Sequence, residues 1–198
     1  MMKKLDCLLQ TMLLVLFVVS SADAQMQVPV SPAKDELYRV DTPEAILKAA
    51  RALMQSDENM ALVTVDDEGQ PRVRTVRAFL TDVDPLDVRR GMTVWVMTRD
   101  TTRKIKQIRK RPQVTLYFND DVKISYLTIM GTAVVHTDPN NPRVKPFVRD
   151  GYKEFFWPQF PKGFVMLEII PRWIEFMGPG IKNHKENWRP QSVEFPPK

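Results

Sequence analysis

The segment "MTRDTTRKIKQIRKRPQVTLYF", residues 97–118, decides the fold, because it inserts a basic helix between two apolar strands. Residues 92–98, "MTVWVMT", predict a strand that is buried on both faces, and residues 113–118, "QVTLYF", predict the next one. The helix between them covers about residues 101–111 and ends at Pro112, which lacks the backbone N–H that a helix interior needs. The central unit is therefore strand, basic helix, strand.

Further apolar runs on both sides of this unit predict a mainly β (α+β) fold. They lie at residues 60–66, 72–81, 122–137 and 163–178, the last as a strand pair or one long bent strand. An amphipathic helix begins at Pro43, with Asp41 or Thr42 as its cap, and a weaker helical region covers residues 142–156. Six strands joined mostly by short turns, with helices outside them, indicate a six-stranded β-barrel.

The N-terminus has the pattern of a secretory signal peptide over residues 1–24. A positive start, "MMKK", precedes a short apolar run, "MLLVLFVV", and small residues, "ADA", stand before Gln25. We expect cleavage after Ala24, export to the periplasm or the medium, and no stable membrane insertion afterwards; an uncleaved anchor is the alternative. Residues 25–40 then form a linker, 41–178 the barrel domain and 179–198 a Pro-rich tail, in which Trp188 could cover a cleft.

Composition narrows the chemistry. Apolar residues make up 43% of the chain and charged residues 27%, with a net charge of +5, which is typical of a globular protein. The one cysteine, Cys7, lies in the predicted signal peptide, so the mature chain has no disulfide, thiolate metal site or cysteine nucleophile. The only histidines are His136 and His184, which are too few for a multi-histidine metal site. We therefore predict neither a metal site nor a dedicated catalytic acid or base.

Three interpretations fit the basic segment. It can be a solvated helix that packs through Ile105 and Ile108, which is the usual role of a charged run. It can bind nucleic acid, but no aromatic residue lies between Trp95 and Tyr117 to stack on bases, so we expect no nucleic-acid partner. It can also hold a phosphate group, because threonine hydroxyls, cationic side chains and unpaired helix N–H groups meet at the start of a helix.

The order and spacing of three stretches resemble the flavin-binding split barrel of the pyridoxamine 5′-phosphate oxidase superfamily, and its general-stress-protein branch most of all. These stretches are "PRVRTVRAF", "VWVMTRDTTRKIKQIRKRPQVTLYF" and "YLTIMGTAVV", and the resemblance covers residues 44–178. It implies a six-stranded split β-barrel that forms a homodimer, with FMN bound without a covalent bond in a cleft between the subunits.

The same resemblance implies which residues hold the cofactor. Arg74 matches a strand arginine that binds the FMN phosphate, and Thr98 lies beside the flavin ring. Thr102, Arg103 and Lys104 match a Ser-Arg-Lys group that grips phosphate and ribityl oxygens. Tyr126 stands where the oxidases carry a glutamine. The full predicted set is Arg74, Thr75, Val76, Thr98, Thr102, Arg103, Lys104 and Tyr126.

Departures from the oxidase pattern argue against a phosphorylated vitamin-B6 substrate. Phe79 replaces the lysine that holds the substrate phosphate, Met177 replaces a tryptophan near the end, and an Arg-Leu-His run is missing. We therefore expect an exported FMN-binding flavoprotein, an oxidoreductase of unknown substrate and unknown electron donor. The alternative is a flavin-binding or haem-binding stress protein without turnover, with haem held through one histidine.

Overall fold

The computed structural model describes residues 42–56, 58–81, 90–148, 154, 159–178 and 190–195. The predicted signal peptide, the predicted linker, His184 and Trp188 lie outside these residues. Within the described ranges, no helix is long and apolar enough to cross a membrane.

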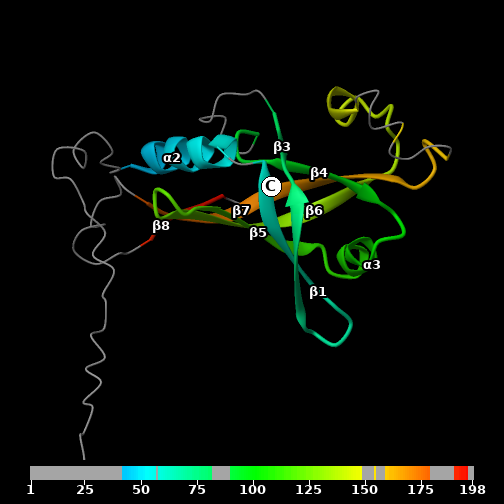
Figure 1. Cartoon of the computed structure of the whole chain (residues 1–198), viewed down its shortest axis with the longest axis horizontal. Helices are drawn as coiled ribbons and strands as arrows, with labels where there is room; N and C mark the ends of the chain where they lie inside the picture. The colour runs from blue at the N-terminus through cyan, green and yellow to red at the C-terminus, as the bar shows by residue number, and fades with distance from the viewer. Residues whose placement is uncertain are drawn as a thin grey trace, which may run out of the picture. The chain divides into compact units, whose positions relative to one another are not determined.

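Helix α2, Pro43–Ser56, begins where the sequence predicts it. The Thr42 Oγ1 accepts a hydrogen bond from the Ala45 N–H at 3.3 Å, and Pro43 occupies the first helical position. One face of the helix is buried in the core, and it includes Ile46, Leu47, Ala50, Leu53 and Met54. A capped amphipathic helix therefore covers one part of the barrel (Figure 1).

The strands form one antiparallel sheet of eight members in the described part of the chain. Its order is β2-β1-β5-β6-β7-β4-β3, and β8 pairs with β7. The strands are β1 Asn59–Val65, β2 Pro71–Arg77, β3 Phe79–Leu80, β4 Val94–Arg99, β5 Gln113–Asp120, β6 Ser125–His136, β7 Phe164–Met177 and β8 Gln191–Glu194. Helix α3, Arg103–Lys110, joins β4 to β5, and a short 3₁₀ helix, η2, covers Lys145–Phe147 within the region predicted to be weakly helical.

The sheet curls so that its two edges meet. Edge strands β2 and β3 follow one another in the chain and are separated only by Ala78, whose N–H donates to the Glu58 carbonyl at 2.6 Å. The chain thus passes from one edge of the sheet to the other at this residue. The predicted split β-barrel, a mainly β fold with flanking helices, is confirmed (Figure 1).

The predicted count of six strands is wrong, for two local reasons. The run 72–81 breaks at Ala78 into β2 and β3, because the two halves belong to opposite edges of the sheet. Strand β8 comes from the predicted tail and pairs with β7 from Trp173 to Phe176. Phe195 just beyond it is 3% exposed and belongs to the core, which explains why this part of the tail joins the barrel.

Alternation along the strands separates two apolar clusters. On β4, Val94 and Val96 enter the main core of the barrel, whereas Trp95 points to the opposite face. There Trp95 belongs to a second cluster with Val144, Phe164 and Met166. The sheet around β4 and β7 is therefore covered on both faces.

Strands β6 and β7 approach each other closely at Gly131. The β6–β7 register shifts between Met130 and Gly131, and a Cβ atom at Gly131 would lie 2.5 Å from the Ile170 carbonyl oxygen. Only a residue without a side chain fits here, as is common where a strand bulges.

Candidate anion-binding site

Helix α3 is held against β1 by a narrow buried stripe. Ile105 and Ile108 are buried in the main core, and Gln107 is buried beside them. The remaining helix positions are occupied by cations, so the helix has one apolar edge and a basic surface. This packing brings the basic helix to the inner side of the β1–β2 hairpin.

Arg74 on β2 is held by two uncharged side chains. Its Nη1 donates to Thr64 Oγ1 at 2.7 Å, and its Nη2 donates to Gln107 Oε1 at 3.3 Å. Thr64 in turn donates to Gln107 Oε1 at 2.6 Å. Thr64 and Gln107 are both buried, so this network fixes the guanidinium without neutralising it.

Arg74, Arg103 and Lys104 form a cluster of positive charge, which we call the cationic cluster. Burial, followed by the charges of Arg103 and Arg72, lowers the pKa of Arg74. Burial, followed by the charge of Arg74, lowers the pKa of Lys104. Among the described residues, no carboxylate forms an ion pair with any member of the cluster. Partly buried cations that repel one another favour a bound anion.

Lys106 and Lys110 of α3, together with the C-cap residue Arg111, lie close to a carboxylate of the fold. Asp67, in the β1–β2 turn, lies 2.7 Å from Lys110 Nζ, 3.8 Å from Lys106 Nζ and 3.9 Å from Arg111 Nη1. Arg111 also donates to the Asp66 carbonyl at 2.6 Å. The basic segment is thus divided into a structural part at the helix C-terminus and the cationic cluster at its N-terminus.

The start of α3 adds backbone donors to the cluster. Thr102 is the N-cap residue, but its hydroxyl donates to the Arg99 carbonyl at 2.8 Å and caps no helix N–H. The first N–H groups of a helix have no partner within it, and they carry the positive end of the helix dipole. The Thr102 hydroxyl is therefore engaged, while the N–H groups beside Arg103 and Lys104 have no side-chain cap.

Three further predicted residues lie on β2 and β4 and differ in their exposure. On β2, Thr75 is exposed, and Val76 is half-buried against the main core. Thr98 is buried near the end of β4, opposite Val165 of β7, on the same face of the strand as Val94 and Val96.

Tyr126 does not join the cluster within one chain. Strand pairing connects Arg74 to Leu62, Leu62 to Leu116 and Leu116 to Ile129, so β6 lies three strands away. At about 4.8 Å between strands, the path along the sheet from β2 to the Tyr126 strand is roughly 14 Å. The Tyr126 hydroxyl donates to Glu175 Oε1 at 2.9 Å.

Thr64 and Gln107 were missed by the sequence interpretation. Thr64 alternates with Leu62 on β1, so the period of the strand predicts a buried position there, and a buried polar side chain needs a partner. Gln107 gives no such signal, because it lies off the helix face that Ile105 and Ile108 share.

The donor set fits a phosphate group. Guanidinium and ammonium groups at a helix N-terminus are the usual ligands of phosphate oxygens, and the cluster has no described counter-charge to displace. No group of three or more His, Cys, Asp or Glu side chains that could hold a metal occurs in the described ranges.

A family model described as pyridoxamine 5′-phosphate oxidase matches residues 46–178, which contain the cationic cluster and strands β1 to β7. The chain belongs to the pyridoxamine 5′-phosphate oxidase family. No curated protein matches the chain.

Several solved structures have a fold similar to that of this chain. A Clostridium acetobutylicum protein related to general stress protein 26 of Bacillus subtilis has a TM-score of 0.59 and 19% identity, over 77% of this chain and 96% of its own. An FMN-binding, pyridoxamine 5′-phosphate oxidase-related protein from Nostoc punctiforme has a TM-score of 0.51 and 13% identity, over 85% and 98%. A haem-binding protein from Mycobacterium smegmatis has a TM-score of 0.55 and 14% identity, over 78% and 59%.

Proposed function

We propose that the chain binds FMN without a covalent bond, with the phosphate on the cationic cluster, and that it acts as an oxidoreductase. The observation that carries the proposal is the cationic cluster itself. It contains three cations, and one of them, Arg74, is held only by uncharged partners. No carboxylate among the described residues forms an ion pair with the cluster. A phosphate dianion would relieve the repulsion among these cations. The flavin supplies the redox chemistry when bound, while the protein orients it.

The test is an absorption titration of the protein with FMN and, in parallel, with riboflavin, which lacks the phosphate. Wild type is expected to bind FMN at least tenfold more tightly than riboflavin. Changing Arg74 and Lys104 together to Ala should remove this preference. Lys110→Ala is the matched control, because it removes one cation of the same helix that Asp67 already neutralises. Equal affinity of the double variant and wild type for FMN would sink the proposal.

Turnover separates an oxidoreductase from a flavin-binding protein without activity. In an oxidoreductase, the bound flavin is reduced by an electron donor and reoxidised by an acceptor, and both steps are visible in the flavin absorption. A protein that only stores flavin binds it but shows no catalytic acceleration of either step. Anaerobic reduction of bound and free FMN by the same donor is the direct comparison.

Haem is the second candidate ligand, as the resemblance to a haem-binding structure suggests. His136 is the only histidine in the described ranges, and its Nε2 lies 3.0 Å from Glu168 Oε2. This contact engages Nε2, so only Nδ1 of this ring is available to ligate the haem iron. Titration with haemin, followed by its Soret band in wild type and in His136→Ala, distinguishes the two.

We also propose a homodimer through the outer face of β5 and β6. Large apolar side chains are exposed there: Tyr117 at 40%, Met130 at 48% and Val134 at 38%. Tyr126 lies on the same face of β6 and stacks on Tyr117 at 5.8 Å. In a dimer Tyr126 would reach a cofactor from the partner subunit. Sedimentation of wild type and Met130→Glu tests this, with a monomeric wild type as the contradicting result.

Export remains part of the proposal, based on the pattern of residues 1–24. Mass spectrometry of the protein expressed in a bacterial host should find Gln25 as the first residue in the periplasm or the medium. Recovery of the full-length chain from the cytoplasm only would contradict it.

A further inference from the structure

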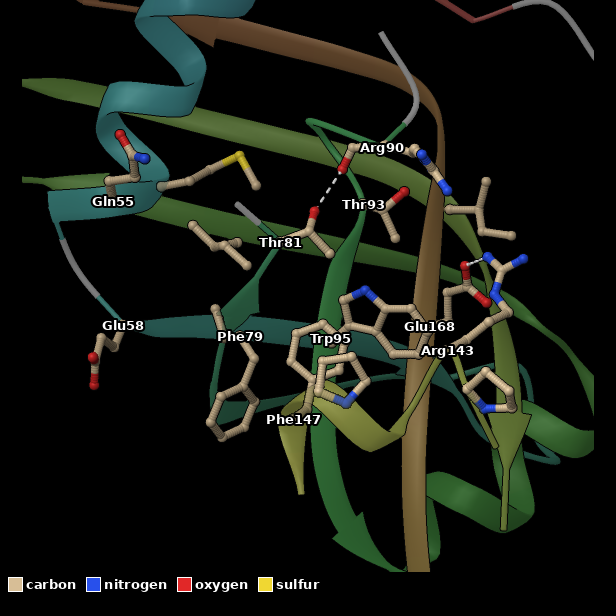
Figure 2. Close-up of a pocket in the computed structure, with 16 residues that line it drawn as sticks. Gln55, Glu58, Phe79, Thr81, Arg90, Thr93, Trp95, Arg143, Phe147 and Glu168 are labelled. Atoms are coloured by element: carbon tan, nitrogen blue, oxygen red, sulfur yellow. Dashed lines mark hydrogen bonds and ion pairs between the residues drawn. The ribbon is translucent and has the colours of Figure 1, made fainter. Parts of the chain in front are cut away.

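A cavity of about 890 Å³ opens beside the edge strand β3, outside the cationic cluster. It is lined by residues from α2, β3, β4 and β7 and by the segment around η2. Its size is within the range of cavities that hold small organic molecules. We call it the Trp95 cavity, after the tryptophan at its centre (Figure 2).

One part of the wall of the Trp95 cavity is aromatic, formed by Phe79, Trp95 and Phe147. The rings of Trp95 and Phe147 lie 4.8 Å apart between centroids, with an angle of 31° between their planes. Phe79 pairs with Trp95 across β3 and β4, so the two side chains are neighbours on one face of the sheet. Figure 2 shows the Trp95 indole between Phe147 and the Glu168–Arg143 pair. Flat rings of this kind favour a flat ligand.

The charged residues that line the cavity are already engaged. Arg143 donates to Glu168 Oε1, and Glu168 Oε2 lies 3.0 Å from His136 Nε2. Glu58 forms an ion pair with Arg77, and Arg90 also has an interaction partner. A ligand therefore needs no charge of its own to be accommodated, and a charged one would compete with these pairs.

One polar group in this wall is left unmatched. Trp95 is 3% exposed, and its Nε1–H has no hydrogen-bond partner in the described part of the chain. It is the one such buried side-chain atom found among the described residues. Indole N–H groups are donors only, and a buried donor without an acceptor is unfavourable. What the wall lacks is an acceptor oxygen.

We propose that the Trp95 cavity binds an uncharged, flat aromatic or quinonoid molecule, whose carbonyl oxygen accepts a hydrogen bond from Trp95 Nε1. As a ligand site it is independent of the cationic cluster. It goes beyond the proposed function, because Trp95 lies on the face of β4 opposite Thr98.

Duroquinone, a flat quinone with two carbonyl groups, is the probe, and durene, the same ring and methyl groups without oxygen, is its matched control. Binding is measured by calorimetry on the full chain without FMN, and by the indole ¹⁵N–¹H resonances. We expect saturable duroquinone binding, at least tenfold tighter than durene, and a downfield shift of the Trp95 resonance with duroquinone alone.

Trp95→Phe removes the donor and keeps an aromatic ring. It should weaken duroquinone binding about tenfold without affecting durene, whereas Trp173→Phe, outside the cavity, should change neither. The Trp95 resonance in wild type decides the question even if Trp95→Phe does not fold. Absence of duroquinone binding, equal binding of durene, or preferential binding of the carboxylate 2,4,6-trimethylbenzoate would each overturn the proposal. Failure to bind FMN would leave it intact, because the measurement contains no flavin.

Discussion

Gln107→Glu is the most incisive perturbation of the cationic cluster. The Gln107 amide oxygen lies 3.3 Å from Arg74 Nη2 and accepts from Thr64 at 2.6 Å, so the amide holds the arginine without cancelling its charge. A glutamate has the same shape, but it places a carboxylate where the structure has a neutral acceptor. The guanidinium then has an internal counter-ion and less attraction for a phosphate.

The expected magnitude follows from the interaction that is lost. A hydrogen bond to a charged group contributes about 1.5–3 kcal/mol. Losing one Arg74–phosphate interaction of this kind should raise the Kd for FMN roughly 10- to 150-fold. Repulsion between the new carboxylate and the phosphate acts in the same direction. The lowered pKa of Arg74 means that the fold of the wild type disfavours the charged form of this side chain. A carboxylate at position 107 would favour the charged form, so the free energy of unfolding should not fall.

The assay compares FMN with riboflavin in wild type, Gln107→Glu and Gln113→Glu. Gln113 is exposed at the start of β5, so its substitution makes the same change in net charge away from the buried network. Only Gln107→Glu should lose the preference for FMN, with a melting temperature equal to or above that of wild type. An unchanged FMN affinity, or an equal loss for riboflavin, would refute the role assigned to Gln107.

Three further predictions concern the barrel and its titrating groups. Gly131→Ala should lower the free energy of unfolding by about 1–3 kcal/mol in urea, because the new methyl meets the Ile170 carbonyl; an unchanged midpoint would contradict this. Burial, followed by the hydrogen bond to Glu175, raises the pKa of Tyr126 from 10.0 to about 12. The fold thus favours the neutral phenol, and its contribution to stability should hold below pH 10 and disappear as pH rises to about 12, a loss that Tyr126→Phe should not show. The pKa of Lys104 is lowered from 10.5, so the ammonium loses its proton before a rising pH reaches that value. As pH rises, FMN affinity should therefore begin to fall before pH 10.5. Lys104→Arg should keep its affinity to higher pH, and identical profiles would show that Lys104 does not hold the phosphate.

Local sequence patterns predicted most of the barrel. Helix α2 begins at Pro43 with Thr42 as its cap, because capping and the apolar period act within a few residues. The central strand–helix–strand unit appears as β4, α3 and β5 for the same reason. The two additional strands were not predictable in this way. Ala78 separates β2 from β3, and residues 191–194 pair with β7, only because distant edges of the sheet meet there.

The sequence by itself determined that a basic helix with threonines at its start follows an apolar strand, since those features depend on residues close together in the chain. Only the tertiary structure decided which cations remain available. Asp67 forms ion pairs with Lys106 and Lys110 of α3, whereas Thr64 and Gln107 hold Arg74 without a counter-charge. The free energy of a charge depends on its burial and on its neighbours in space, and those neighbours come from β1, β2 and α3 together.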